Sequence, residues 1–418
     1  MSNMQTNFLK YLHDVGKVLI KGAKSYGEVT VVHHDDADGL VSAAILKFLL
    51  NKLNIDSHLI CLEKTYPQII SKLESSHGLL IYADLAAPHA RMISNLNRKR
   101  DLIIIIDHHD PEKVDDPKII NVNPEFFNIS GEREASASTV TYLLVRSVLG
   151  SVPLLAKLAV IGATEIPGEP ISLNKIVIDE ALRLGVVKVA KKKRIDYYIL
   201  EDNLLIPRSE YSKKLTILGS VGYYRKGPQL AIKACLEGFS KDLEVLYKEF
   251  EKERRSLYKK ALSQIRSRNI SYSKNILWFH VKNLFINVGS KVLGTFTSYL
   301  VYRMFMNSSR YVIGFMYLNP EIPGFGKLDG DYSKVSLRTT PRLANLIRHK
   351  LRPSSSELLY NHCKALGGFG DGHEYAASGI LPRGKEETLI ERIESDIHLF
   401  ISKKLRHKKK SEGLDKYL

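Results

Sequence analysis

Apolar residues recur in two alternating patterns over the first 160 positions of the chain. Helical spacing of apolar residues predicts helices around 8–19 and over 40–53. Short apolar runs between polar residues predict strands at 29–32, 57–62, 79–82, 102–106 and 119–122. Because strands and helices alternate, successive strands require crossover connections, so the pattern predicts an α/β fold with a parallel sheet.

The pattern changes between about 176 and 272, where a mainly helical connector is predicted. One face of a long charged helix is apolar, with Leu243, Phe250 and Ile265 among its residues. The other face is densely basic, and a further basic run occupies 191–194. Such a helix is typical of a solvated connector, but its cationic side chains could also follow a phosphate backbone. These side chains are Arg254, Arg255, Lys259, Lys260, Arg266 and Arg268.

Strand patterns return after about 273 and predict a second, smaller α/β domain. The predicted strands are 276–281, 284–288, 311–317 and 334–338, with a loop over 324–330. A helix over 386–405 leads into a basic tail, of a kind that is commonly disordered and binds polyanions. The predicted divisions of the chain are therefore 1–175, 176–272, 273–402 and 403–418.

Acidic and imidazole side chains follow three of the strands predicted in the N-terminal part. Parallel strands gather ligands at the edge formed by their carboxyl ends, so these side chains are expected to converge. Oxygen and imidazole ligands without thiolates suit Mn²⁺ or Mg²⁺. The sequence therefore predicts a divalent metal site built from His34, Asp36, Asp38, Asp84, Asp107, His108 and His109.

Two features of these clusters bear on that prediction. In an extended segment His34, Asp36 and Asp38 would point the same way, and Gly39 would let the chain turn into the next helix. The Asp107-His108-His109 run could instead be a capping aspartate with two surface histidines. However, an acid and two imidazoles directly after five consecutive apolar residues are costly to place without a function. This favours metal or phosphate chemistry.

Composition adds a candidate partner. The chain has 62 Lys and Arg against 45 Asp and Glu in 418 residues, a formal net charge of +17. A surplus of this size favours polyanions, above all nucleic acid, although a generally basic surface would give the same total. The three cysteines are far apart, which indicates neither a disulfide framework nor a structural zinc site. No apolar run approaches 18 residues and no signal peptide is recognisable, so a cytoplasmic protein without a membrane partner is expected.

The clusters resemble the motifs of the DHH phosphoesterase superfamily, and of its archaeal RecJ-like nucleases in particular. The resemblance rests on His34-Asp35-Asp36-Ala37-Asp38-Gly39, Asp107-His108-His109, Asn123-Pro124 and Glu134-Ala135-Ser136-Ala137-Ser138. It implies a site for two Mn²⁺ or Mg²⁺ ions. His34 and Asp36 would hold one ion. Asp38 and His108 would hold the other, with Asp84 as the bridge.

The resemblance also implies roles beyond metal binding, and it contains one departure. Asp107 would orient a histidine, and His109 would position the phosphate. The fourth motif of the family ends in Gly-Ala-x-Gly-Asp, whereas this chain reads Ile161-Gly162-Ala163-Thr164-Glu165-Ile166. Glu165, one position early, either replaces the missing aspartate or leaves the second metal one ligand short.

The segment from Gly367 to Gly379 resembles the Gly-Gly-His-x-x-Ala-Ala-Gly signature of the domain that accompanies DHH nucleases. Two residues depart from that signature, Asp371 before Gly372 and Ser378 before Gly379. Upstream, Val335-Ser336-Leu337-Arg338 resembles a Ser-x-Arg element of the same domain, in which an arginine can bind phosphate through two hydrogen bonds. The resemblance assigns substrate phosphates to Ser336, Arg338, Gly370, Gly372 and His373.

The function that these features imply is metal-dependent phosphodiester hydrolysis, as an exonuclease on single-stranded DNA or RNA, with the active site in the cleft between the two domains. One alternative is a weakly active or inactive RecJ-like subunit of a replication complex, which binds GINS or the helicase. A further alternative is hydrolysis of small oligonucleotides or cyclic dinucleotides, although such substrates need less positive surface and no basic tail.

Overall fold

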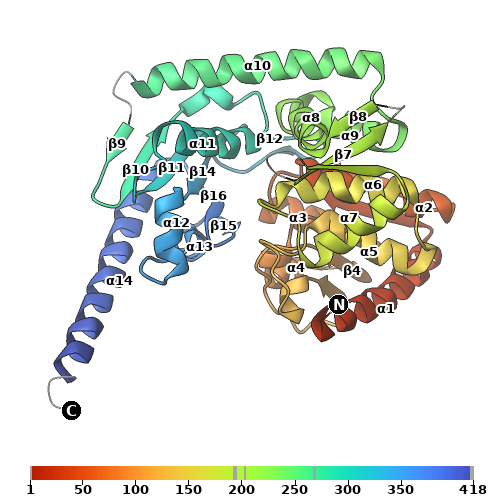
Figure 1. The fold of residues 1–418 in the computed structure, drawn as a ribbon, viewed down its shortest axis with the longest axis horizontal. Coiled ribbons are helices and arrows are strands. Elements are labelled where there is room, and N and C mark those ends of the chain that lie inside the picture. The colour runs from red at the N-terminus through yellow and green to blue at the C-terminus, as the bar shows by residue number, and fades with distance from the viewer. Residues whose placement is uncertain (1, 192–194, 202–203, 267–269, 415–418) are drawn as a thin grey trace. The chain divides into compact units, whose positions relative to one another are not determined.

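The computed structural model describes residues 2–191, 195–201, 204–266 and 270–414, and Figure 1 shows its elements. Contacts divide the chain into two compact units, Met1–Glu253 and Arg254–Leu418. This division differs from the segments predicted from the sequence, because it joins most of the predicted connector to the N-terminal sheet. Arg268 and positions 192–194 of the predicted basic run lie outside the described residues.

The first unit is built on a five-stranded sheet in the order β2-β1-β3-β4-β5. Every neighbouring pair is parallel, which confirms the predicted sheet. The strand order reverses between β1 and β3, and such a switch point opens a crevice for ligands at the carboxyl ends of the strands. The strands are β1 (Glu28–His33), β2 (Asp56–Cys61), β3 (Leu79–Ala83), β4 (Leu102–Ile106) and β5 (Ile119–Val122).

Helix α2 (Ala37–Lys52) lies at the centre of this unit. It is buried along most of its length because it packs against β1 on one side and against α5, α6 and α9 on others. A helix that is apolar all round is typical of such a position. The other helices of this part are α1 (Asn3–Tyr26), α3 (Pro67–Leu73), α4 (Ala90–Leu96), α5 (Ala137–Leu149) and α6 (Pro153–Gly162).

The first half of the predicted connector is not purely helical. It contains a three-stranded antiparallel sheet in the order β6-β7-β8, which the helical interpretation missed. Its helices pack on the parallel-sheet unit, and α8 contacts α2 directly. The elements are α7 (Ser172–Arg183), β6 (Val187–Lys191), β7 (Ile195–Glu201), β8 (Leu204–Pro207), α8 (Arg208–Val221), α9 (Gly227–Glu237) and α10 (Lys241–Arg266).

The second unit is built on a mixed six-stranded sheet in the order β15-β16-β14-β11-β10-β9. Only β10 and β11 pair in parallel among these strands, which confirms a smaller C-terminal α/β domain. Two further strands, β12 (Glu321–Ile322) and β13 (Gly326–Lys327), form a hairpin, and only the second of them lies in the predicted loop over 324–330. The sheet strands are β9 (Ile270–Tyr272), β10 (Ile276–His280), β11 (Tyr311–Tyr317), β14 (Tyr332–Arg338), β15 (Phe369–Gly372) and β16 (Ala376–Pro382).

Helices cover both faces of the mixed sheet (Figure 1). Helix α11 packs on β11 and β14 from one side, and a core of buried residues from α12, α13 and α14 fills the other side. The predicted strand 284–288 is wrong, since a 3-10 turn occupies Lys282–Phe285 and buries Phe285 against Phe296. The helices are α11 (Lys291–Met304), α12 (Pro341–Arg348), α13 (Ser355–Ala365) and α14 (Glu386–Leu414).

The last helix extends past its predicted end. α14 continues to Leu414, so most of the predicted basic tail lies in this helix, and 415–418 fall outside the described residues. Lysine, arginine and glutamate are good helix formers, and no proline interrupts the segment. Within the described ranges, no helix combines the length and apolar character that a membrane span requires.

Candidate metal centre

The carboxyl end of β1 carries the first group of predicted ligands. His34 follows the strand, and its Nδ1 lies 3.0 Å from Asp36 Oδ2. Its Nε2 lies 3.3 Å from Asp35 Oδ1, and Asp35 is fully buried. The ring is therefore held between two carboxylates, with Nδ1 on the side of the other predicted ligands. Our interpretation of the sequence gave Asp35 no role, because its neighbour in space could not be identified from the motif.

The extended conformation predicted for this segment is wrong beyond Asp36. Asp36 is the N-cap of α2 and accepts a hydrogen bond from Gly39 N, so Asp38 already lies in the first helical turn. A capping carboxylate satisfies free amides at the helix start, which fixes this geometry. Gly39 is needed for close approach rather than for a turn, because a Cβ there would lie 2.6 Å from His34 Cβ.

Asp38 is fixed by the start of another helix. Its Oδ1 accepts a hydrogen bond from Ser138 N at 2.8 Å, and its Oδ2 accepts one from Ala137 N at 2.9 Å. These amides begin α5, whose N-terminus favours a negative charge. The segment around Ser136, noted above only for its resemblance, therefore positions a predicted ligand.

Asp84 lies between the two groups of ligands. Its Oδ2 is 3.6 Å from His34 Nδ1, and its Oδ1 is 3.5 Å from His108 Nε2. The residue has a φ of 63°, a left-handed conformation that is strained for an aspartate and is typical of functional sites. One carboxylate oxygen thus faces each group, as the bridging role requires.

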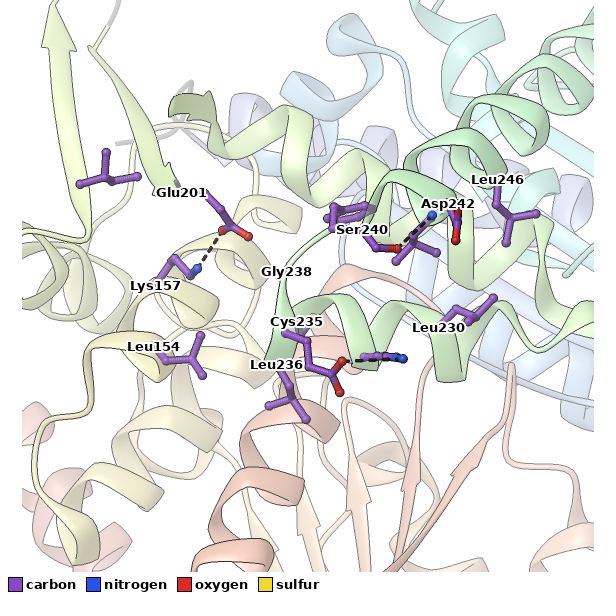
Figure 2. A pocket seen from close by; sticks show the side chains of 15 residues that line it. Leu154, Lys157, Glu201, Leu230, Cys235, Leu236, Gly238, Ser240, Asp242 and Leu246 are labelled. Atoms are coloured by element: carbon purple, nitrogen blue, oxygen red, sulfur yellow. Dashed lines mark hydrogen bonds and ion pairs between the residues drawn. The ribbon is translucent and has the colours of Figure 1, made fainter. Parts of the chain in front are cut away.

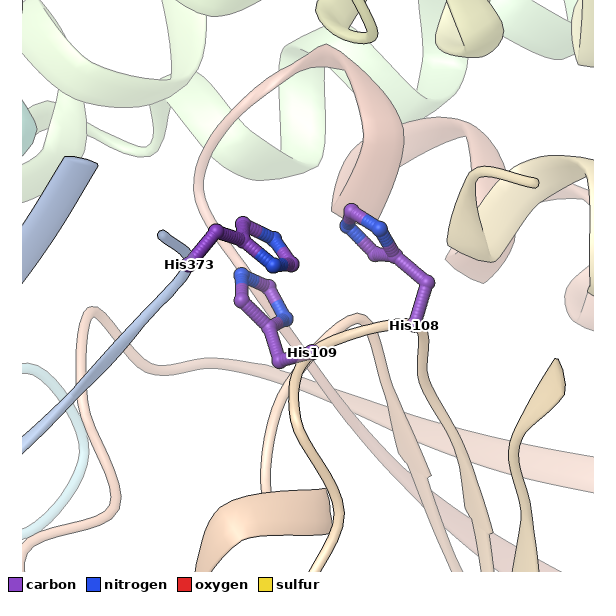
Figure 3. Close-up of side chains that lie close together, drawn as sticks. All are labelled: His108, His109 and His373. Carbon is purple, nitrogen blue, oxygen red and sulfur yellow. The ribbon is translucent and has the colours of Figure 1, made fainter. Parts of the chain in front are cut away.

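The Asp107-His108-His109 run follows β4 directly, and Figure 3 shows the two imidazoles on this segment. Asp107 Oδ1 accepts hydrogen bonds from His108 N and from His109 Nδ1, both at 2.7 Å. Its Oδ2 accepts one from Ala87 N. Asp107 therefore orients the His109 ring and fixes the main chain at His108 through one buried carboxylate.

Backbone groups from outside the motif fix the other faces of this run. His108 Nδ1 lies 2.6 Å from the carbonyl oxygen of Gly131, which directs Nε2 toward Asp84 and Asp38. Gly131 tolerates no side chain, since a Cβ there would lie 1.7 Å from His108 O. The side-chain amide of Asn123 also contributes, since its Nδ2 donates a hydrogen bond to His109 O at 2.8 Å. A carbonyl on the second ring nitrogen is the usual way in which proteins orient a metal-binding histidine.

The electrostatics of the cluster follow from its burial. Burial lowers the pKa of an imidazole, but Asp36 and Asp35 raise that of His34 to about 10. Burial acts in the same way on His108, and the carboxylates of Asp84 and Asp38 raise its pKa to about 10. Burial and the charge of Asp84 raise the pKa of Asp38 to about 7. Burial would raise the pKa of Asp107, but His109 holds it well below its usual range.

This donor set fits divalent cations. The Oδ1 atom of Asp84 is buried and, apart from the His108 ring at 3.5 Å, has no hydrogen-bond donor in the part of the chain that the structure describes. Ligand atoms within 4.8 Å of one another form two groups that share Asp84, namely His34, Asp36 and Asp84, and Asp84, Asp107, His108 and His109. Buried carboxylates in excess of cationic groups require compensation, which metal ions provide.

Glu165 is not brought into either group. It lies exposed on the 3-10 turn Ala163–Glu165, and its Oε1 accepts a hydrogen bond from Thr216 Oγ1 at 2.9 Å. Thr216 Oγ1 in turn accepts one from Ala37 N. Glu165 therefore contacts the α8 residue that braces the start of α2. Gly162 lies closer to the cluster, since a Cβ there would be 3.1 Å from Asp38 Oδ1.

In the second unit, Arg338 and Ser336 lie on the face of β14 that α11 covers. Arg338 donates from Nε to Ser298 Oγ and from Nη1 to Ala377 O, and no carboxylate in the described ranges pairs with it. Burial lowers its pKa to about 10, so the guanidinium remains charged. Ser336 Oγ is buried without a hydrogen-bond partner among the described residues. A Cβ on Gly294 of α11 would lie 2.8 Å from Arg338 and 3.7 Å from Ser336 Oγ, so this glycine lies beside both polar groups.

The glycine-rich segment forms a β-hairpin. Gly370 pairs with Gly379 and Gly372 with Ala377 in the β15–β16 ladder. His373 lies in the connecting turn, and its amide donates to Ala376 O. Alternating glycines allow strands to pack closely, so this sequence pattern fits a ladder as well as an anion loop.

A pocket of about 700 Å³ in the first unit lies apart from the ligand groups (Figure 2). It is lined by α6, β7, α9 and the start of α10, and Lys157 pairs with Glu201 on its wall. None of the predicted site residues lines it. The metal cluster, rather than this pocket, is therefore the candidate site.

Comparison with known families agrees with this geometry. Residues 28–163, which hold all the ligands described in the first unit, match the model of the DHH family, N-terminal domain. This chain contains a DHH family domain. The matched residues begin at β1 and end beside the 3-10 turn that carries Glu165, so they include both groups that share Asp84.

Several known proteins match nearly the whole chain. An uncharacterized protein of Methanocaldococcus jannaschii is 25% identical over 433 residues, 93% of this chain and 98% of that protein. RecJ of Thermus thermophilus, solved with Mn²⁺, matches 93% of this chain with a TM-score of 0.62 at 18% identity. The match covers 54% of RecJ, so this chain spans about half the length of that protein. CDC45 of Entamoeba histolytica matches 94% of this chain and 99% of its own, with a TM-score of 0.57 at 9% identity. These likenesses show a RecJ-like fold.

Proposed function

We propose that this protein is a metal-dependent phosphodiesterase that acts as an exonuclease on single-stranded DNA or RNA. The observation that carries the proposal is Asp84, whose two oxygens face His34 and His108 at 3.6 and 3.5 Å. A bridging carboxylate between two ligand groups is the arrangement that two-metal phosphoryl chemistry uses.

Two divalent ions, Mn²⁺ or Mg²⁺, would be held by this chain. His34 and Asp36 would bind one ion and His108 and Asp38 the other, with Asp84 shared. When bound, such ions lower the pKa of a water and stabilise the attacking and leaving oxygens. The amides that fix Asp38 and the Gly131 carbonyl that fixes His108 preorganise these ligands, so little rearrangement is needed on binding.

His109 would act on the substrate rather than on the ions. Its Nδ1 bonds to Asp107, so Nε2 is the atom that can contact a phosphate or exchange a proton. Asp107 fixes the ring orientation and the tautomer, as a buried carboxylate beside a reacting histidine does elsewhere.

Residues of the second unit would bind substrate phosphates. Support comes from the partly buried cation of Arg338 and from the buried hydroxyl of Ser336. Among the described residues, the first pairs with no carboxylate and the second has no hydrogen-bond partner. An arginine without a counterion suits a phosphate through two hydrogen bonds. His373, Gly370 and Gly372 keep the roles that the sequence resemblance implies. The net charge of +17 favours a polymeric anion.

The test incubates the full chain with Mn²⁺ and end-labelled single strands of DNA and RNA. We expect progressive shortening from one end, loss of this activity in EDTA, and loss in Asp84→Asn. Cleavage confined to cyclic dinucleotides or to strands of a few nucleotides would identify the small-substrate alternative. No cleavage of any of these by protein with two bound Mn²⁺ ions would refute phosphodiester hydrolysis.

A second candidate function is favoured by one observation. Glu165 bonds to Thr216 and lies outside both ligand groups, so the described fourth-motif segment places no carboxylate in the cluster. A weakly active or inactive RecJ-like subunit of a replication complex, which binds GINS or a helicase, fits that feature. Calorimetric titration with Mn²⁺ separates the two candidates, because one weak site without turnover favours the subunit and two occupied sites with turnover favour the nuclease.

A further inference from the structure

Helix α10 carries exposed basic side chains along one face, which we call the α10 stripe. The helix runs unbroken from Lys241 to Arg266. At about 100° per residue, six of its cations lie within roughly 40° of one direction. All six are exposed: Lys241, Lys248, Lys252, Arg255, Lys259 and Arg266. The same sector contains no acidic residue, only Val245 and Ser263 besides the cations.

The acidic residues of α10 lie outside this sector, roughly 60–120° around the helix from Lys241. Glu244 pairs with Lys214, Glu251 with Lys213, and Glu253 with Arg225. These partners lie on α8 or just after it, so the pairs hold α10 against the helices beneath. The two exposed carboxylates of α10, Asp242 and Glu249, lie about a quarter turn from the stripe. These three carboxylates thus pair with cations outside α10, and Lys248, Lys252 and Lys259 have no ion-pair partner in the part of the chain that the structure describes.

This arrangement is unfavourable for a helix that only connects two units. Like charges spaced three or four residues apart, such as Lys248, Lys252 and Arg255, repel one another and destabilise a helix. Lys241 stands at the first helical residue, where the helix dipole disfavours a cation. No carboxylate in the described part of the chain pairs with Lys248, Lys252 or Lys259. A polyanionic ligand would remove this repulsion.

We infer that the α10 stripe binds the sugar-phosphate backbone of single-stranded nucleic acid. That the ligand is single-stranded rests on the proposed function. The stripe spans 25 residue steps, or about 37 Å at about 1.5 Å per residue. That length suits a polymer and far exceeds a dinucleotide. Rows of lysine and arginine without base-reading groups bind phosphates irrespective of sequence. The length of the stripe therefore assigns a polymer, rather than a small nucleotide, as its ligand.

The test combines Lys248→Gln, Lys252→Gln and Lys259→Gln in the full chain. Glutamine keeps the helix propensity of lysine, so the fold is expected to persist, as circular dichroism would verify. Binding of a labelled single strand of about 30 nucleotides is measured in EDTA over a range of salt. At about 0.7 units of slope per lost contact, we expect the salt slope to fall by about two. Affinity at about 0.1 M salt should fall by about 10–100-fold.

The matched control is Lys10→Gln, Lys21→Gln and Lys24→Gln on α1, which removes the same charge from exposed positions. An unchanged slope in the α10 variant, or an equal fall in the α1 control, would overturn the inference. If the stripe instead binds an acidic protein surface, the salt slope of strand binding should be unchanged in the α10 variant. Binding in EDTA needs no catalysis, so a chain that binds through the stripe but hydrolyses nothing refutes the proposed function alone.

Discussion

The two units hold charge of opposite sign, buried in the first and partly buried in the second, each without enough compensation from the described residues. The first unit buries Asp36, Asp38, Asp84 and Asp107 around two imidazoles at the ends of β1, β3 and β4. The second holds the partly buried guanidinium of Arg338, with no carboxylate paired with it in the described ranges. Because uncompensated buried charge destabilises a fold, each unit is expected to bind a ligand of the opposite sign. The difference assigns cations to the first unit and an anion to the second.

The two sites also differ in how they are braced. Ligands of the first unit are fixed by backbone groups from distant segments, such as Ala87, Gly131 and Ala137. Arg338 and Ser336 lie two residues apart on one strand, and among the described residues of other elements only Ser298 Oγ and Ala377 O accept hydrogen bonds from the arginine. A metal site requires ligands within narrow distances, whereas an anion tolerates more variation in donor position. We therefore expect substitutions in the first unit to have the larger effects.

Asp84→Asn should have the largest effect. An amide oxygen is a poorer ligand than a carboxylate and cannot bridge two ions. Loss of a residue that only orients a ligand lowers metal affinity by about 10–100-fold, so loss of this ligand should lower Mn²⁺ affinity by more than that. Hydrolysis should be abolished while single-strand affinity, which rests on lysines and arginines, stays within about twofold. Calorimetry and strand binding measure the two properties.

The control for that prediction is Asp115→Asn, an exposed carboxylate on the loop that follows β4 and carries Asp107, whereas Asp84 follows β3. It should change neither property. Hydrolysis at the normal rate by the Asp84 variant would show that the bridging role is wrong.

Metal binding should strengthen as pH rises. The folded pKa values of His34 and His108 are raised to about 10, so both imidazoles are protonated near neutral pH and must lose a proton to bind an ion. Apparent Mn²⁺ affinity should therefore rise by up to about tenfold per pH unit for each proton released, between about pH 6 and 9. Calorimetry in buffers of different ionisation enthalpy measures the number of protons that are released when Mn²⁺ binds. Proton uptake on binding would contradict this protonation state.

The same shifts predict the stability of the metal-free protein. A folded pKa above the unfolded value of about 6.5 stabilises the fold below that pH, and this stabilisation is lost as pH rises toward 10. The raised pKa of Asp38 acts in the same direction between about pH 4 and 7. In EDTA, Tm should therefore fall from about pH 6 to 9, and added Mn²⁺ should raise Tm most at the higher pH. A Tm that rises with pH in EDTA would contradict the burial of these pairs.

Arg338→Gln should have a smaller effect, confined to the anion. Loss of charge-assisted hydrogen bonds to phosphate should raise KM by about 10–100-fold while Mn²⁺ affinity is unchanged. Arg348→Gln, an exposed arginine on α12 of the same unit, is the matched control and should leave KM as it is. An equal loss of Mn²⁺ affinity in the Arg338 variant would remove the distinction between the two sites.

Glu165→Gln should have the smallest effect. Thr216 can donate to an amide oxygen as well as to a carboxylate, so activity and Mn²⁺ affinity should change by less than about threefold. A loss of orders of magnitude, together with a higher metal requirement, would show instead that Glu165 leaves Thr216 and serves as the missing fourth-motif ligand.

The sequence by itself determined the parallel sheet and the position of the ligands along the chain. A buried strand such as Leu102–Ile106 appears in the sequence as a continuous run of apolar residues, and the polar residues that follow it must lie at the edge of the sheet. The net charge and the three acid and imidazole clusters could also be identified without knowledge of the fold. Local patterns sufficed here because hydrophobic periodicity depends only on nearby residues.

Only the tertiary structure decided which atoms meet and which segments form short strands. The Gly131 carbonyl behind His108, the α5 amides on Asp38 and the Thr216 hydroxyl on Glu165 all come from positions distant in sequence. Strands β6 to β8 and the β15–β16 hairpin likewise depend on pairing with other segments rather than on their own pattern. These contacts were hidden in the sequence because a side chain's partner across a fold is set by the packing of whole elements, which no local spacing encodes.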